Sequence, residues 1–156
     1  GAGRAVAWAL CDLGVNQLTV ANRHAERAAS LMKSLGDQEL DVSAYGLDDP
    51  MLERKLRDTA LLVNATSLGM SGGPGPDDLP VPAEWLHREL FVYDIVYRPA
   101  ETPLLAQARA IGCRVLGGLE MLVLQGAASL ERWTGRPAPV PTMMNAARSA
   151  LAAPAA

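Results

Sequence analysis

A short polar stretch near the start of the chain has the residue types and spacing of an anion-binding site. In the segment LTVANRHAERA, from Leu18 to Ala28, an apolar run ends at Asn22 and is followed by Arg23 and, one helical turn later, by Arg27. Guanidinium groups bind phosphate oxygens in pairs through charge-assisted hydrogen bonds, and the positive end of a following helix adds to the attraction. The alternative is a solvated helix terminus with two surface arginines.

The position of Arg23 suggests which anion this is. It follows the glycines at the start of the chain by about 20 residues, the spacing at which dinucleotide-binding folds place the residue that contacts the adenosine ribose. A carboxylate there accepts hydrogen bonds from the ribose hydroxyls and repels a 2′-phosphate, whereas a guanidinium does the reverse. The basic pair therefore predicts a preference for NADP over NAD.

The glycines in the opening segment GAG have two interpretations. Gly1 and Gly3 are either the first two glycines of a G-x-G-x-x-G turn, which would put Val6 in the third position, or the end of such a turn. We favour the second, because it leaves a helix of about three turns before Gly14. A helix after an unrelated stub is the structural alternative. We expect Gly1, Ala2 and Gly3 to contact the cofactor.

Composition indicates one ordinary globular domain. Of the 156 residues, 49% are hydrophobic, and the formal net charge is -3. Neither sign of charge dominates, so net charge supports neither a nucleic-acid partner nor an anionic membrane. No apolar run reaches the roughly 18 residues of a spanning helix, and we expect a cytoplasmic protein. Cys11 and Cys113 are expected to be reduced, although the sequence alone leaves a disulfide open.

Strand and helix signals alternate along the chain. Strands are expected at 17–22, 40–47, 60–67, 90–97 and 113–118, and helices at 4–14, 26–36, 48–58, 102–112, 119–133 and near 141–151. The strands lack regular polar alternation and most connections are short, which is typical of a parallel sheet covered by helices on both faces. We therefore predict one doubly wound, Rossmann-like α/β domain over residues 1–156, in which 136–156 form a linker and a last helix.

One element of that fold is not found in the sequence. A doubly wound nucleotide-binding domain begins with a strand that leads into the glycine turn. This chain opens directly on a helical pattern, so we expect the first strand to be missing at its N-terminus. A sheet without that central strand would leave unpaired backbone along the neighbouring strand.

Three further motifs occur in unbroken order: NATSLGM at 64–70, YDIVYRPAETPLL at 93–105 and MLVLQGA at 121–127. With the rest of the chain, from Gly1 to about Leu151, they resemble the C-terminal, NADP-binding domain of the shikimate dehydrogenase family, which includes relatives acting on quinate and aminoshikimate. The resemblance implies hydride transfer between NADPH and 3-dehydroshikimate. It also implies that the catalytic lysine and aspartate belong to an N-terminal substrate domain, which nothing in this chain matches.

The resemblance also assigns binding residues. The family's phosphate-binding motif, Asn-Arg-Thr-x-x-Arg, appears as NRHAER and implies that Asn22, Arg23, His24 and Arg27 hold the cofactor phosphate. His24 replaces the family's threonine, so one hydroxyl contact to the phosphate is lost. The other implied cofactor contacts are Asn64, Ala65, Thr66, Ser67, Ile95, Gly118 and Met121, and the implied substrate contacts are Tyr97 and Gln125.

Several of these assignments make physical sense without the family. Gly118, beside Gly117, leaves room for a flat ring to approach the backbone. Met121 and Gln125 lie four residues apart and would share one helix face, where a thioether beside an amide suits a nicotinamide facing a polyol. The alternatives are core packing for Met121, a surface amide for Gln125 and a half-buried sheet position for Tyr97.

Other functions remain open. A quinate or aminoshikimate dehydrogenase differs mainly in the substrate domain. A non-catalytic dinucleotide-binding module would bind NADPH without turnover. A methyltransferase shares the glycine turn but would carry an acid where this chain has Asn22 and Arg23, which counts against it. We expect a small-molecule substrate and a homodimer, and no nucleic-acid or membrane partner.

Overall fold

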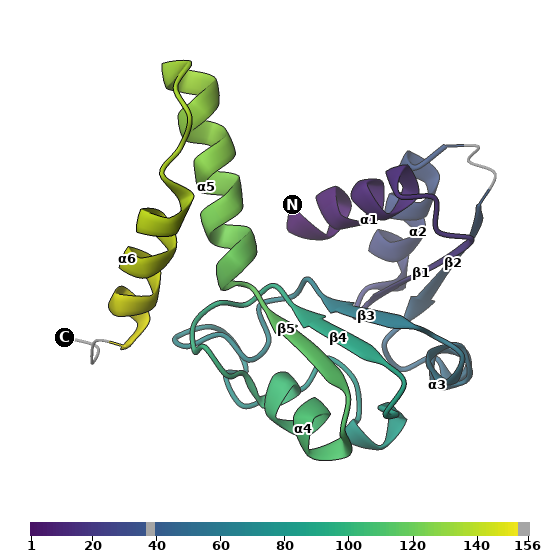
Figure 1. Ribbon diagram of the computed structural model, residues 1–156. Helices are drawn as coiled ribbons and strands as arrows, with labels where there is room; N and C mark the ends of the chain where they lie inside the picture. Colours follow the sequence, from purple (N-terminus) through teal and green to yellow (C-terminus); the bar gives the residue numbers. More distant parts are fainter. Residues whose placement is uncertain (37–39, 153–156) are drawn as a thin grey trace.

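Helices and strands alternate along the chain in the predicted order (Figure 1). The structure is a computed structural model, and it describes residues 1–36 and 40–152. The helices are α1 (Ala2–Asp12), α2 (Ala25–Ser34), α3 (Pro50–Arg57), α4 (Pro103–Ile111), α5 (Leu119–Thr134) and α6 (Val140–Ala152). The strands are β1 (Gln17–Asn22), β2 (Asp41–Gly46), β3 (Leu61–Asn64), β4 (Phe91–Asp94) and β5 (Arg114–Gly117). Residues 153–156, the end of the predicted last segment, lie outside the described residues.

The strands pair in parallel and form two sheets. β1 pairs with β2, and Asn22 at the end of β1 stands opposite Gly46. The second sheet has the order β3-β4-β5, with Asn64, Asp94 and Gly117 in one row at the carboxyl ends of its strands. Because doubly wound sheets bind ligands beyond the carboxyl ends of their strands, this row marks the edge at which a site is expected.

Helices cover both faces of the strands. Figure 1 shows α1 and α2 on one side and α3 and α4 on the other; α2 packs on β1 and β2, and α4 packs on β4 and β5. α5 leaves the carboxyl end of β5 and pairs with α6, so these two helices extend away from the sheets (Figure 1). This arrangement confirms the predicted doubly wound α/β class.

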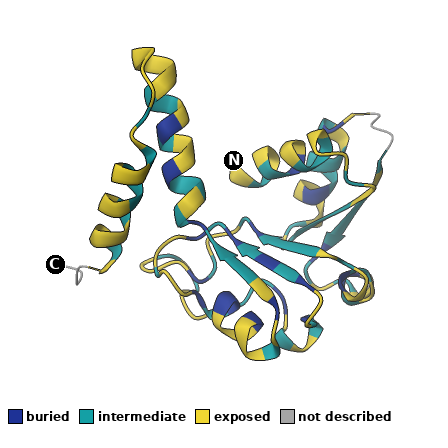
Figure 2. Ribbon diagram, in the orientation of Figure 1, coloured by how far each residue is buried: buried dark blue, intermediate teal, exposed yellow. Residues whose placement is uncertain are grey.

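The most deeply buried part of the core lies between β4 and α4. Leu90, Val92, Leu104 and Leu105 are at most 1% exposed, and Figure 2 shows buried positions in both elements. The start of α4 is fixed by Thr102, whose hydroxyl oxygen accepts a hydrogen bond from the Leu105 N–H at 3.3 Å. A side-chain cap of this kind satisfies one of the free donors of the first helical turn, and it attaches α4 firmly beside the end of β4.

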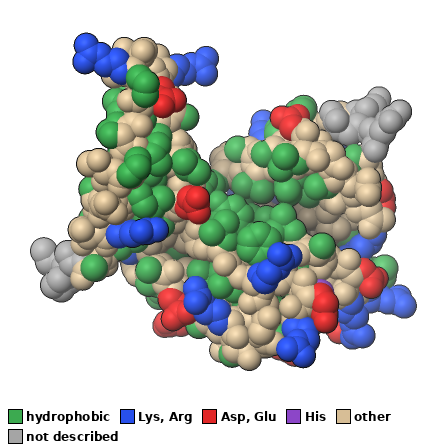
Figure 3. Space-filling model, viewed as in Figure 1, with side chains coloured by type: hydrophobic (Ala, Val, Ile, Leu, Met, Phe, Trp, Pro, Cys, Tyr) green, Lys and Arg blue, Asp and Glu red, His purple; other side chains and the backbone are tan. Residues whose placement is uncertain are grey.

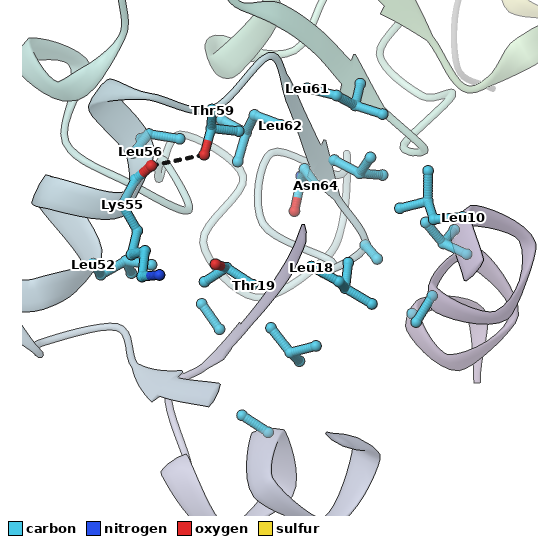
Figure 4. A pocket seen from close by; sticks show the side chains of 18 of the residues that line it. Leu10, Leu18, Thr19, Leu52, Lys55, Leu56, Thr59, Leu61, Leu62 and Asn64 are labelled. Carbon is cyan, nitrogen blue, oxygen red and sulfur yellow. Dashed lines mark hydrogen bonds between the residues drawn. The ribbon is translucent and has the colours of Figure 1, made fainter. Parts of the chain in front are cut away.

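A cavity of about 760 Å³ separates the two sheets. Figure 4 shows Leu18 and Thr19 of β1 on one side of it and Leu61 and Leu62 of β3 on the other. Apolar side chains of α1 and α3 also line it, and no ladder joins β1 to β3 among the described residues. A doubly wound sheet with this connectivity has a further strand between these two, and none of the described residues forms one there.

Two expectations from composition concern the cysteines and membranes. Cys11 and Cys113 are both free thiols, not a disulfide, and burial raises the pKa of the Cys113 thiol. Within residues 1–36 and 40–152, even the 16-residue α5 falls short of a membrane-spanning helix in length and apolar character.

Candidate functional site

β3 and β4 both end at a side chain that turns back onto the backbone. The Asn64 side-chain oxygen accepts a hydrogen bond from the Thr66 N–H at 3.0 Å, and Asp94 Oδ1 accepts one from the Val96 N–H at 3.0 Å. Such Asx turns offer the backbone an alternative to the sheet ladder. The strands predicted at 60–67 and 90–97 are therefore too long at their carboxyl ends.

Asp94 is fully buried, and its two carboxylate oxygens accept several hydrogen bonds. Besides the Val96 N–H, Oδ1 accepts from the Asn64 amide at 3.0 Å, and Oδ2 accepts from the Thr102 hydroxyl at 2.6 Å. Burial raises the pKa of Asp94, and these hydrogen bonds act in the opposite direction. No buried side-chain polar atom in the described part of the chain lacks a partner. Both side-chain oxygens of Asp94 are thus hydrogen-bonded, at the carboxyl end of β4 where the site is expected.

The turn after β3 carries exposed hydroxyl groups on a fixed backbone. The Asn64 side-chain oxygen also accepts from the Thr66 hydroxyl at 2.7 Å, and that hydroxyl oxygen accepts from the Leu68 N–H at 3.1 Å. Thr66 and Ser67 are exposed, whereas Asn64 is only 2% exposed. Of the four residues expected to line the cofactor, Asn64 therefore holds the turn, and Thr66 and Ser67 face outward.

The start of α1 lies beside this turn. A Cβ at Gly3 would be 3.6 Å from the Ala65 Cβ, an ordinary contact. The helix has no acidic residue in its first turn, and Gly1 caps it without a side chain. The first N–H groups of a helix have no intrahelical acceptor. The structure thus brings the predicted glycine segment and the predicted 64–67 segment together at one edge.

The basic segment after β1 lies at the corresponding edge of the first sheet. Asn22 does not cap α2; its side-chain oxygen accepts from the His24 N–H at 3.0 Å, and His24 is the N-cap residue. Arg23 and Arg27 are exposed, and within the described residues neither guanidinium forms an ion pair. His24 Nδ1 lies 3.8 Å from a carboxylate oxygen of Glu26. Two cations without an acidic partner are thus available to an anion.

Gly118 has a different role from the one its lack of a side chain suggested. A Cβ at Gly118 would overlap the Ile95 carbonyl group, and the Gly118 N–H donates to the Val96 carbonyl at 3.2 Å. The chain's own backbone therefore fills the space on the side-chain face of this glycine. Its contact with a cofactor through the remaining backbone stays a prediction.

The residues expected to contact substrate are exposed. The exposed fraction of Tyr97 is 42%, and Gln125 is an exposed position of α5, while Met121 is half-buried. No side-chain hydrogen bond of Tyr97 or Gln125 is formed within the described residues, so the structure leaves both amide and hydroxyl free for a ligand. Burial raises the pKa of the Tyr93 hydroxyl group on β4, and the Glu120 carboxylate at the start of α5 raises it further.

Sequence reasoning missed Asp94 and Thr102. Both residues do carry a sequence signal. Asp94 is an acid within an apolar strand pattern, and Thr102 stands directly before a proline at a helix start. The first pattern is typical of an Asx turn, and the second of an N-cap. What the sequence does not contain is their contact with each other, because it depends on how β4 packs against α4.

The chain is similar to known proteins over nearly its whole length. Residues 118–148 match the family model described as the shikimate 5'-dehydrogenase C-terminal domain. The shikimate dehydrogenase (NADP(+)) of Moorella thermoacetica is 44% identical over 154 residues, which cover 98% of this chain and 52% of the relative. This chain belongs to the shikimate dehydrogenase family.

Solved structures of this family and its relatives share the fold. The shikimate 5-dehydrogenase from Thermus thermophilus, in complex with NADP(H) and shikimate, is 40% identical with a TM-score of 0.80, over 96% of this chain and 52% of that chain. The quinate dehydrogenase from Corynebacterium glutamicum, in complex with NAD, is 33% identical with a TM-score of 0.84, over 96% and 52%. This member of the shikimate dehydrogenase family thus spans about half the length of the relatives it matches.

Proposed function

We propose that this chain is the NADP-binding part of a shikimate dehydrogenase-type oxidoreductase, in which hydride passes between NADPH and 3-dehydroshikimate. The observation that carries the proposal is the pair of exposed guanidinium groups, Arg23 and Arg27, without ion-pair partners among the described residues at the carboxyl end of β1. A 2′-phosphate is the part of NADP that NAD lacks, and two free guanidinium groups attract it strongly.

The residues present fit the remaining parts of the same cofactor. The start of α1, next to Ala65, offers free backbone N–H groups to a pyrophosphate. A hollow lies between the α5–α6 pair and the α1 side of the molecule, with hydrophobic side chains gathered at its base (Figure 3). Surroundings of this kind suit the flat nicotinamide ring. NADP supplies the hydride chemistry when bound, and the chain's own residues bind and orient it.

We assign the roles as follows. Asn22, Arg23, His24 and Arg27 hold the ribose phosphate, and Gly1, Ala2 and Gly3 hold the pyrophosphate. Asn64, Ala65, Thr66 and Ser67 run along the cofactor, and Ile95, Gly118 and Met121 face the nicotinamide. Tyr97 and Gln125 contact the substrate. The lysine and aspartate that handle the proton are proposed to lie in an N-terminal substrate domain, so no catalytic residue is assigned in this chain.

A quinate dehydrogenase is the second candidate, favoured by the similarity to the quinate dehydrogenase structure, with its TM-score of 0.84. Aminoshikimate is a further alternative substrate. A non-catalytic module would bind NADPH and turn over none of the three. We also propose a cytoplasmic location and a homodimer; the exposed Leu124 and Trp133 on α5 leave apolar surface that a second copy would cover. Cell fractionation and analytical ultracentrifugation test these two proposals.

Calorimetric titration with NADPH and NADH tests the cofactor assignment. We expect NADPH to bind about tenfold or more tightly than NADH, because one charge-assisted contact to a phosphate contributes that much. Equal affinities would contradict the NADP assignment, and no binding of either would contradict the dinucleotide site altogether. In a protein that also carries the proposed N-terminal substrate domain, oxidation of shikimate, quinate and aminoshikimate with NADP+ separates the three reactions. The absence of turnover in that longer protein, with NADPH bound, favours the non-catalytic module.

A further inference from the structure

One buried carboxylate fixes the direction of the Asn64 side chain. A carboxylate only accepts hydrogen bonds, and an amide group carries one donor end and one acceptor end. Because Asp94 accepts from the Asn64 amide nitrogen, the Asn64 oxygen is directed at Thr66, where it accepts from both the N–H and the hydroxyl. The shape of the turn at 64–68 therefore depends on an acceptor in the neighbouring strand.

The same carboxylate fixes the loop after β4. Asp94 Oδ1 accepts from the Val96 N–H, which sets the peptide plane between Ile95 and Val96. The Val96 carbonyl accepts in turn from the Gly118 N–H at the start of α5. Ile95 is tied to β3 as well, since its N–H donates to the Asn64 carbonyl at 3.1 Å. The proposed nicotinamide contacts thus depend on Asp94 through this second route.

The surroundings of Asp94 make these contacts strong. Asp94 and Thr102 are 0% exposed, Asn64 2% and Val96 5%. Water therefore does not compete for Asp94, and hydrogen bonds in a site shielded from water are stronger than exposed ones. The contact with Thr102 uses the other carboxylate oxygen and leads to the cap of α4.

We propose that Asp94 is a positioning residue of the cofactor site: its carboxylate orients the Asn64 amide and the Val96 peptide, and so holds the turn after β3 and the loop after β4 in one binding geometry. Asp94 itself is 0% exposed, so it offers no surface for direct contact with a ligand. The inference rests on the proposed NADP-binding function, and it adds a residue outside the set of direct contacts.

Two probes and two variants test the proposal in the chain of residues 1–156. The probes are NADPH and adenosine 2′,5′-bisphosphate, which carries the 2′-phosphate but no nicotinamide. Asp94→Ala removes the acceptor of both loops, while the matched control Thr102→Val removes the hydrogen bond to Oδ2 and the cap of α4 and keeps the methyl group beside Gly69. We expect Asp94→Ala to weaken NADPH binding about tenfold and to change bisphosphate binding less than about twofold. Thr102→Val should leave both affinities within about twofold although it lowers the thermal midpoint.

The proposal is overturned if Asp94→Ala weakens both probes equally or neither, or if Thr102→Val matches its effect on NADPH. Should Asp94→Ala fail to fold, Asp94→Asn replaces it, because its side-chain oxygen still accepts from both loops but without charge. Amide hydrogen exchange at Thr66 and Val96 should then be faster in Asp94→Asn than in Thr102→Val, and equal rates overturn the proposal. Wild-type chain that binds neither probe contradicts the proposed function, while the exchange rates still decide whether Asp94 holds the two loops.

Discussion

A Cβ atom at Gly118 would overlap the backbone carbonyl of Ile95. The loop after β4 and the start of α5 therefore meet through bare backbone, joined by the hydrogen bond from the Gly118 N–H to the Val96 carbonyl. Gly118 has a φ of -76°, which any residue adopts. The close approach of two backbone segments, and not an unusual conformation, requires glycine at this position.

Gly118→Ala is expected to lower the free energy of unfolding by about 1–3 kcal/mol, because the backbone must move to admit the methyl group. Denaturant-induced unfolding measures this loss. Gly126→Ala is the matched control within α5, since a Cβ there would meet only Met143 Cε at an ordinary 3.5 Å. That variant should gain about 0.5–1 kcal/mol from helix propensity. Equal losses at the two positions would mean that the contact with Ile95 is unimportant.

Arg23→Ala should weaken NADPH binding by about 1.5–3 kcal/mol and leave NADH binding nearly unchanged, because only NADPH carries the 2′-phosphate. Calorimetric titration of both cofactors gives the two values. Arg109→Ala is the control, because this exposed arginine of α4 lies away from the basic segment after β1. Its Nε lies 3.3 Å from a carboxylate oxygen of Glu101, and its loss should change neither affinity. Equal losses for NADPH and NADH in Arg23→Ala would contradict the phosphate contact.

The stability of the chain should depend on pH through Asp94. Burial raises the folded-state pKa of this carboxyl group, so the folded protein keeps a proton at pH values where the unfolded chain has lost it. The resulting stabilisation is complete below the ordinary aspartate pKa of about 4 and is lost as the pH rises through the raised folded-state value. Asp94→Asn has no such proton to lose.

Unfolding of the wild type and Asp94→Asn across about pH 4 to 8 measures this effect. The free energy of unfolding of the wild type, minus that of the variant, should decrease as the pH rises above about 4. A difference that stays constant, or that grows with pH, would show that the folded state does not raise the pKa of Asp94.

The gap between β1 and β3 should accept a strand. An extended segment of about six residues rich in Val and Ile, joined in front of Gly1, would pair with the open edges of both strands and fill the apolar cavity. We expect a higher thermal midpoint and slower amide exchange in β1 and β3. The same segment with a central proline is the control, because proline cannot donate to a ladder. Equal midpoints for the two extensions would contradict strand pairing.

The order of elements was predictable because each segment carries its own local signal. Proline near the start of α3 and α4, and glycine after α4 and α5, mark helix ends directly. The carboxyl ends of β3 and β4 were not predictable in this way. Strand-forming residues continue past Asp94, and Ala65 and Thr66 after Asn64 give no clear stop signal. The hydrogen bonds of the Asn64 and Asp94 side chains to the following backbone mark where the strands end.

The residues proposed for direct contacts could be named from the sequence, whereas the residues that support them could not. Arg23 and Arg27 could be proposed from the sequence because their residue type and their spacing after the glycines are both visible there. Asp94 and Thr102 act through contacts with residues distant in the sequence, which only the packed structure defines. Gly118 shows the same limit: the sequence indicates that a side chain is excluded, and the structure identifies the Ile95 carbonyl as the group that excludes it.

The shared acceptor at Asp94 has a consequence for how this protein tolerates substitution. Asn64, Thr102 and Asp94 form one hydrogen-bonded unit, so the effects of changing two of them are not independent. Once Asp94 is lost, replacing Asn64 or Thr102 no longer costs the hydrogen bond to Asp94, and such pairs typically show interaction energies of about 0.5–3 kcal/mol. This epistasis predicts that neutral drift replaces the three residues together, as a set, and seldom one at a time.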